Sequence, residues 1–172
     1  VGFLNYFSPI YLNRIGASQS NIGRIFMIYG VCLVYVAPFI SKYIDASRNQ
    51  KMYIVASGIL GSMAFLLFHF SEGLTTTAVA VLFLGLSSSF AASQRSYILG
   101  LETTKRLGAG KAMGVFNSVY RVGQVLGPMT FGWLLAFVSI KHGITYLGLC
   151  YLLATSLFLL AAKNNPRKIQ YE

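Results

Sequence analysis

Long stretches without a charged residue are the feature that most constrains how this chain can fold. Each is close to the roughly 20 residues that an α-helix needs to cross the hydrocarbon core of a bilayer. The stretches are Ile25–Ser41, Met52–Ser71, Gly73–Gln94, Val122–Ile140 and Gly143–Ala162. Only 10% of the 172 residues are charged, whereas about a quarter are charged in an ordinary soluble domain. The sequence therefore predicts an integral membrane protein made of transmembrane helices.

We expect six helices: a short apolar run at the N-terminus, and the five charge-free stretches, some of which continue past a single arginine. The first is too short to span, and because residue 1 is Val rather than Met we interpret the chain as a fragment that begins inside a helix. The expected helices are residues 1–12, 20–40, 52–70, 75–99, 111–138 and 144–162. We predict an all-α membrane fold in two parts, a six-helix transmembrane bundle at 1–162 and a short basic cytoplasmic tail at 163–172.

Basic side chains orient these helices, because short loops rich in Lys and Arg stay on the cytoplasmic side of a membrane. Six passes place nine basic residues on one side: Lys42, Arg48, Lys51, Lys105, Arg106, Lys111, Lys163, Arg167 and Lys168. The other side has only Arg14 and Lys141. We therefore expect the side with nine to be cytoplasmic, with the C-terminus inside the cell and the protein in the plasma (inner) membrane, surrounded by lipid.

Several classes of function are disfavoured by the same sequence. The formal charge of +10 would favour a nucleic-acid partner in a soluble protein, but here the basic residues lie mostly between apolar spans. Cys32 and Cys150 lie within apolar stretches, and His69 and His142 have no acidic neighbour at metal-ligand spacing. No nucleophile elbow, phosphate loop or zinc-binding helix motif occurs. We expect no nucleic-acid partner, no cofactor, no metal and no enzyme activity.

A polar stripe runs along the fifth expected helix. Asn117, Arg121 and Gln124 are spaced i, i+4 and i+7, so they share one face, and Tyr120 adjoins them. Arg121 is about ten residues, or roughly 15 Å, from either end of the helix, which places it near the middle of the bilayer. A guanidinium there costs several kcal/mol unless it meets water, an acid, a carbonyl or an anionic ligand. The acidic residues of the chain all belong to expected loops or ends.

Three interpretations of Arg121 follow from this position. A carboxylate from outside this chain could pair with it, or a water-filled cavity could bring it a substrate with negative or hydrogen-bond-accepting groups. Alternatively, Arg121 is a structural residue whose guanidinium binds backbone carbonyls. In the cavity interpretation, Arg121, Asn117, Gln124 and Tyr120 are the candidate substrate-binding residues.

A different face of the same helix is built for packing. Gly123 and Gly127 are four residues apart and let another backbone approach closely. Pro128 removes one backbone hydrogen bond and permits a bend. The alternative is an ordinary packed membrane helix, in which Gly and Pro are common.

The connection after the second expected helix carries an acid among basic residues. Asp45 ends one span and is followed by basic residues before the next, so it can pair across the membrane–water boundary and cap helix ends. Arg95, near the inner end of the fourth expected helix, is a candidate partner for Asp45. The alternative is that Asp45 is only a solvated turn residue.

This connection resembles a loop motif of the major facilitator superfamily of secondary transporters. That motif has Gly, three residues, Asp, a basic residue, any residue, Gly, any residue and two basic residues. The chain keeps Asp45 and Lys51. It departs from the motif at four positions, Ser41, Ala46, Arg48 and Gln50. The run Gly123 to Gly132 is similar to the Gly-x-x-x-Gly-Pro pattern in the fifth helix of each half of the family's proteins.

The resemblance implies a fold and a mechanism. The chain would be one half of a twelve-helix transporter, built of two inverted three-helix repeats, with the substrate near mid-membrane between the halves. We predict the C-terminal half, and the missing N-terminal six-helix half as its partner. Alternating access would move a small solute, with Asp45 and Arg95 as an inner gate. The rival hypothesis is a six-helix membrane sensor or scaffold domain that transports nothing.

Overall fold

The computed structural model describes residues 8–47, 49–71 and 73–162, apart from the side chains of Asp45 and Ala46. These residues form helices joined by short connections, with no strand among them. The elements are α1 (Ser8–Arg14), α2 (Gln19–Val31), the π-helical segment η2 (Cys32–Val36), α3 (Ala37–Ala46), α4 (Gln50–Phe70), α5 (Leu74–Ser89), α6 (Ala91–Gly100), α7 (Glu102–Leu107), α8 (Ala109–Leu134) and α9 (Ile140–Ala161).

Four helical segments in the described part have the length and apolarity to cross a membrane. They are Gln19–Ile44, Gln50–Phe70, Leu74–Gly100 and Ile140–Ala161, and they coincide with four of the six expected helices. The fifth expected helix corresponds to α8, which is 26 residues long but more polar. The first corresponds in part to α1, and its residues 1–7 lie outside the described ranges. The all-helical architecture of the described residues is confirmed, with four candidate spans, while six spans and inverted repeats stay predictions.

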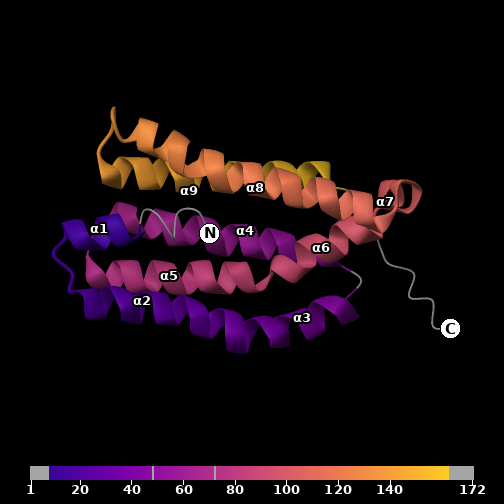
Figure 1. Ribbon diagram of the computed structural model, residues 1–172, viewed down its shortest axis with the longest axis horizontal. Coiled ribbons are helices and arrows are strands. Elements are labelled where there is room, and N and C mark those ends of the chain that lie inside the picture. Colours follow the sequence, from indigo (N-terminus) through magenta and orange to yellow (C-terminus); the bar gives the residue numbers. More distant parts are fainter. Residues whose placement is uncertain (1–7, 48, 72, 163–172) are drawn as a thin grey trace.

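The long helices lie side by side with their axes roughly aligned, and α4 is at the centre of their packing (Figure 1). On one side α4 packs against α9, and on the other side against α5. Glycines bring α4 and α9 close together: a Cβ added at Gly58 would overlap the Thr155 side chain, and one added at Gly61 would overlap the Tyr151 ring. Small residues allow this close approach because helices in lipid are held by van der Waals packing.

A pair of serines joins α4 to α5. The Ser57 hydroxyl lies 3.0 Å from the Ser87 carbonyl oxygen, and the Ser87 hydroxyl lies 2.8 Å from the Ser57 carbonyl oxygen, so each residue can donate to the other. Both side chains are buried. Reciprocal hydrogen bonds of this kind satisfy polar groups that would otherwise be unpaired in an apolar interior.

Two of the spans are interrupted at the point where they meet. In the second expected helix, η2 separates α2 from α3, and in the fourth, Phe90 separates α5 from α6. The Ser89 hydroxyl lies 3.2 Å from the Cys32 carbonyl oxygen and 2.9 Å from the Gly85 carbonyl oxygen of its own helix, so it can donate to either. A Cβ added at Gly85 would lie 2.8 Å from Cys32 Cβ. Neither interruption was predicted from the sequence. Each of these spans was taken as one continuous helix, because no Gly or Pro lies at Phe90 and α2 and α3 are similarly apolar.

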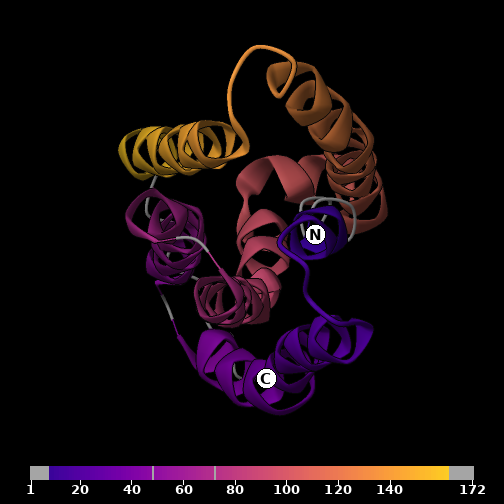
Figure 2. The same cartoon turned by 90° about the vertical axis from the view of Figure 1, so that its left-hand side faces the viewer.

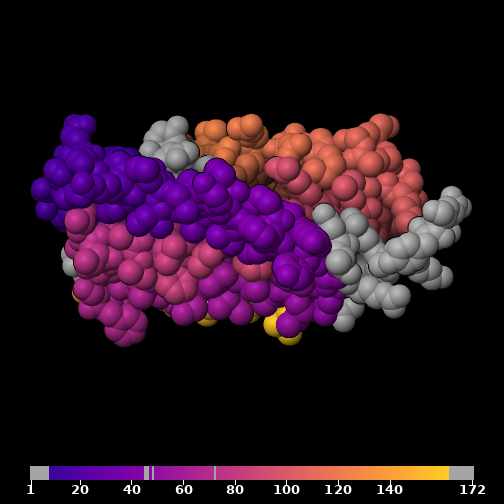
Figure 3. All heavy atoms as spheres, turned by 90° about the horizontal axis from the view of Figure 1, so that it is seen from below, coloured from indigo at the N-terminus to yellow at the C-terminus, as the bar shows by residue number. Residues whose placement is uncertain are grey.

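Helix α8 lies at the edge of the bundle. In the end-on view it stands apart from α4, with α1 and α6 between them (Figure 2). It contacts α6 and α7 at its N-terminal end, and Phe131 is its one buried residue. On another side of the molecule, α2, η2 and α3 lie across α5 as a continuous layer (Figure 3). Much of α8 is therefore left uncovered by the described residues.

Candidate functional site

The polar stripe of α8 lies on the surface of the described bundle. Asn117 and Arg121 are exposed, Gln124 is half-buried, and Tyr120 is 44% exposed. Arg121 Nη1 donates to Gln124 Oε1 at 3.3 Å, so two of the predicted binding residues contact each other. The Tyr120 ring stacks on Phe116 with 6.4 Å between ring centroids. The helix thus presents a guanidinium, two amides and a phenol side by side.

The charge of Arg121 has no carboxylate partner among the described residues, where Gln124 is its hydrogen-bonding neighbour. The amide is neutral and leaves most guanidinium donors available, because a guanidinium carries five N–H groups. The arrangement can therefore bind an anionic or hydrogen-bond-accepting group from outside the described residues.

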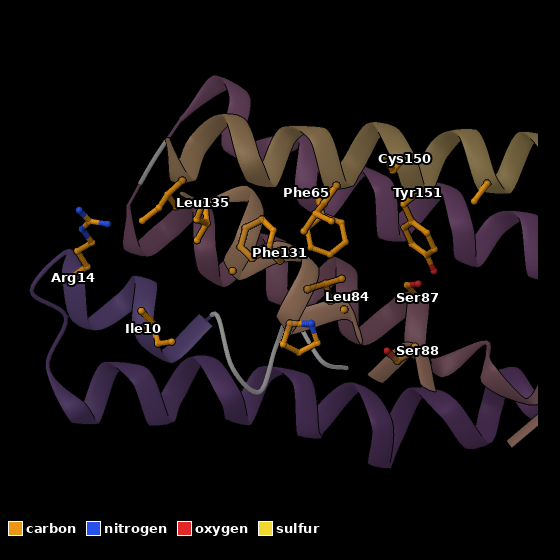
Figure 4. A pocket seen from close by; sticks show the side chains of 17 residues that line it. Ile10, Arg14, Phe65, Leu84, Ser87, Ser88, Phe131, Leu135, Cys150 and Tyr151 are labelled. Atoms are coloured by element: carbon orange, nitrogen blue, oxygen red, sulfur yellow. The ribbon is translucent and has the colours of Figure 1, made fainter. Parts of the chain in front are cut away.

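A groove of about 690 Å³ lies against another part of α8 (Figure 4). Its α8 wall contains Gly123, Gly127 and Pro128, and none of the four predicted substrate-binding residues lines it. The floor comes from α4 and α5 and the opposite wall from α9. The other lining residues are Ile10, Arg14, Phe65, Leu84, Ser87, Ser88, Phe131, Gly132, Leu135, Ile140, Leu147, Cys150, Tyr151 and Ala154.

The polar groups of this groove lie at its two ends. Arg14 lies at one end of it, and the Tyr151 hydroxyl points toward Ser87 at the other (Figure 4). The Ser88 hydroxyl accepts a hydrogen bond from the Tyr29 hydroxyl at 3.2 Å, and the Ser87 hydroxyl donates to the Ser57 carbonyl oxygen. Between these ends the lining is mostly apolar, with Phe65 and Leu84 on the floor.

Only one of the two side chains of the predicted inner gate, that of Arg95, lies among the described residues. Arg95 is exposed on α6. The side chain of Asp45 lies outside the described residues, so its pairing with Arg95 stays a prediction. At the same end of the bundle, the Lys51 ammonium donates to the Ala162 carbonyl oxygen and ties the start of α4 to the end of α9.

Sequence reasoning missed the groove and the residues that shape it. Tyr151 was not singled out, although it lines the groove and packs against Gly61. The serines of the run Ser87 to Ser89 both join helices and line the groove. All three have hydrogen-bonding partners on neighbouring helices, and two of them, Ser87 and Ser88, also line the groove. The spacing of Gly58 and Gly61 was the available signal for close packing by α4.

Comparison with known families assigns the chain. The family described as Major Facilitator Superfamily matches residues 1–171. The chain belongs to the Major Facilitator Superfamily. It is thus an integral, multi-pass membrane protein, as the apolar helices already indicated. No solved structure matches it significantly.

Three curated proteins are similar to this superfamily member. An uncharacterised MFS-type transporter from Methanocaldococcus jannaschii is 28% identical over 90% of this chain and 39% of its own length. A protein from Agrobacterium vitis whose name refers to tartrate transport is 19% identical over 97% of this chain and 37% of its own length. Multidrug resistance protein 2 from Bacillus subtilis is 22% identical over 80% of this chain and 34% of its own length. The chain therefore spans less than two-fifths of each of these relatives.

Proposed function

We propose that this chain is half of a secondary transporter that moves a small solute across the plasma membrane by alternating access. Membership of the Major Facilitator Superfamily and three relatives that bear transport or resistance names support this proposal. The observation that carries it is the exposed guanidinium of Arg121, which has no carboxylate partner among the described residues. Such a group at mid-membrane is favourable only where water, a counter-ion or a ligand reaches it.

The chemistry of the stripe favours a solute with anionic or hydrogen-bond-accepting groups. A planar guanidinium binds a carboxylate or phosphate through two parallel hydrogen bonds. The amides of Asn117 and Gln124 add donors and acceptors, and the Tyr120 ring adds an apolar surface. One relative's name refers to tartrate and another's to multiple drugs, and the stripe matches the former class better because tartrate carries carboxylates.

The proposed architecture is the C-terminal half, with six spans in two inverted repeats and the C-terminus in the cytoplasm. The missing N-terminal half would face the stripe and complete a central cavity, since substrate sites in such transporters lie between two repeats near the bilayer midplane. Rocking of one half against the other would expose Arg121 to each side in turn. Asp45 with Arg95 would close the inner side.

Accessibility of Asn117 in the full-length transporter tests this proposal. Asn117→Cys is introduced after Cys32→Ala and Cys150→Ala, and membranes are treated with a water-soluble thiol reagent. We expect labelling that the transported solute slows.

Val119→Cys is the matched control, because this residue is 67% exposed on the same helix but points about 160° away from Arg121 at 100° per residue. It should stay unlabelled in lipid. Absence of labelling at Asn117→Cys from either side would contradict transport and favour a sensor or scaffold.

A further inference from the structure

Helix α8 has two sides that differ in chemistry. Seven of its exposed large apolar side chains follow one another at spacings of three or four residues, and at about 100° per residue they gather opposite Arg121, Asn117 and Gln124. An apolar stripe of this kind suits lipid and leaves the opposite side for a solute. The seven residues are Val115, Val119, Val122, Leu126, Met129, Trp133 and Phe137.

An aromatic pair borders the polar stripe of α8. The rings of Phe116 and Tyr120 are one turn apart, with 6.4 Å between their centroids and 24° between their planes. Tyr120 lies about 40° from Gln124 around the helix axis, and its side chain is 44% exposed. Aromatic rings prefer offset-stacked or edge-to-face partners at such centroid distances. The exposed part of the pair can therefore receive a third ring from a ligand.

Gly123 keeps the surface beside Tyr120 open. A helical side chain covers the turn that precedes its own Cα, so a side chain at position 123 would lie over the turn of Tyr120. Glycine has no such side chain, and a Cβ built there would meet nothing within 4 Å. The described residues therefore leave room for a planar group next to the Tyr120 ring.

A guanidinium adds charge to this aromatic surface. Arg121 follows Tyr120 directly, donates to the neutral Gln124 amide at 3.3 Å and has no carboxylate partner among the described residues. A small aliphatic carboxylate would engage the guanidinium and leave the aromatic pair unused, whereas a neutral aromatic compound would leave the guanidinium unpaired. A ring that carries a carboxylate makes use of both features.

We propose that the solute bound along α8 is an aromatic carboxylate, with its carboxylate on Arg121 and its ring against Tyr120 and Phe116. The inference rests on the proposed function, since it takes the polar stripe as the solute site, and it narrows the anionic solute to one chemical class. Tyr120 then distinguishes aromatic from aliphatic acids, and Arg121 distinguishes acids from neutral compounds.

Three probes of similar size test this class on the full-length transporter in detergent. Benzoate has both the ring and the charge, cyclohexanecarboxylate has the charge without an aromatic ring, and benzamide has the ring without the charge. Isothermal titration should find benzoate bound about two- to tenfold more tightly than cyclohexanecarboxylate, which is the effect of one aromatic contact. Benzoate should bind at least about tenfold more tightly than benzamide, which cannot pair with a guanidinium. Equal affinities in either comparison would overturn the proposal.

Variants at position 120 assign the selectivity to the ring. Tyr120→Leu should lower the affinity for benzoate about two- to tenfold and leave that for cyclohexanecarboxylate unchanged, whereas Tyr120→Phe should keep the preference for benzoate because the ring remains. Tyr146→Leu is the matched control, since Tyr146 is 46% exposed but lies on α9. Its affinities should equal those of the wild type. A Tyr120→Leu protein that keeps the wild-type preference for benzoate would also overturn the proposal.

Protein-dependent uptake into proteoliposomes separates this inference from the proposed function. Ring-dependent binding of benzoate without its uptake would contradict transport and leave the binding site standing. Binding and uptake of tartrate without binding of benzoate would overturn the aromatic class and leave transport standing. Binding of none of these carboxylates would overturn both.

Discussion

Arg121 is the residue on which the proposed chemistry of this chain depends. It is held by a 3.3 Å hydrogen bond to Gln124 on the same helix. A guanidinium can bind a carboxylate through two parallel hydrogen bonds, so Arg121 would anchor an anionic solute in the proposed transporter.

Replacing this charge should reduce transport without unfolding the protein. We expect Arg121→Gln to lower the transport rate at least about tenfold, because a hydrogen bond to a charged group contributes about 1.5–3 kcal/mol. Arg121→Lys should retain part of the rate, since an ammonium keeps the charge but loses bidentate binding. Solute uptake into proteoliposomes measures the rate, and a thermal melt measures folding.

Arg24→Gln is the matched control for this experiment, because Arg24 is also exposed but lies near the start of α2. Its uptake rate should equal that of the wild type. An unchanged rate in Arg121→Gln would contradict the binding role of the guanidinium.

Gly61 carries the close packing of α4 on α9. Gly61→Ala should lower the free energy of unfolding by about 1–3 kcal/mol, because the new Cβ overlaps the Tyr151 ring and forces a shift. Gly23→Ala is the control, since a Cβ at that position of α2 meets nothing within 4 Å. Thermal unfolding in detergent compares the two purified variants. Equal midpoints would contradict the prediction, because they would mean that α4 and α9 accommodate the added methyl group at Gly61 without loss of stability.

At the scale of elements, the junction of α2–η2–α3 with α5–α6 is the main departure from regular helices. The Cys32 carbonyl oxygen accepts from the backbone N–H of Ala37. The Ser89 hydroxyl can donate its one proton either to this oxygen at 3.2 Å or to the Gly85 carbonyl oxygen of its own helix at 2.9 Å. Just before the junction, Tyr29 and Ser88 are joined by a side-chain hydrogen bond. The two interrupted spans thus contact each other close to their interruptions, η2 in one and Phe90 in the other.

Ser89→Ala should loosen this junction. We expect a loss of about 0.6–1.7 kcal/mol, the range for side-chain hydrogen bonds between membrane helices. Ser156→Ala is the matched control, because the Ser156 hydroxyl donates to the Leu152 carbonyl oxygen within its own helix. Thermal unfolding again gives the comparison. If both variants lose the same stability, the bond between α5 and η2 is no stronger than a local one.

Element boundaries show where sequence reasoning succeeds. Charge-free stretches located four of the spans, because lipid excludes charge from a helix of that length. They did not reveal η2, the break at Phe90 or the short helix α7, since these depend on local hydrogen bonds such as that from Ser93 to the Phe90 carbonyl oxygen. The polar stripe was readable from spacing alone, whereas the groove beside α8 required the positions of α4, α5 and α9.

At the scale of the whole molecule, the predicted cytoplasmic loops gather at one end of the bundle. The end of α3, the start of α4, helix α7 and the start of α8 lie together there, and the α1–α2, α4–α5 and α8–α9 connections lie at the other end (Figure 1). The connections that the sequence predicts to be cytoplasmic thus lie at the same end, and the orientation of that end in the membrane stays a prediction.

Labelling of intact cells tests that orientation. With native cysteines replaced by Ala, Ser71→Cys and Ser139→Cys should react with a membrane-impermeant maleimide, because both lie in connections at the predicted outer end. Thr103→Cys, on α7 at the other end, should react only after the cells are opened. The reverse pattern would invert the topology while leaving the helix assignments intact.

The position of the Ser89 hydroxyl beside the Cys32 carbonyl oxygen has a consequence for how a helix in lipid can bend. A kink in a helix normally breaks the hydrogen bond of a backbone carbonyl, and the hydrocarbon core of a membrane has no donor that could replace it. This oxygen accepts from Ala37 in its own helix, and the Ser89 hydroxyl lies 3.2 Å away with the Gly85 carbonyl oxygen as its other acceptor. If a change in the tilt of α3 breaks the contact with Ala37, Ser89 can donate to the Cys32 oxygen instead. We therefore expect bending to cost less free energy at this level of the second span than in the uninterrupted α4 or α9, and conformational change in the proposed transporter to concentrate there.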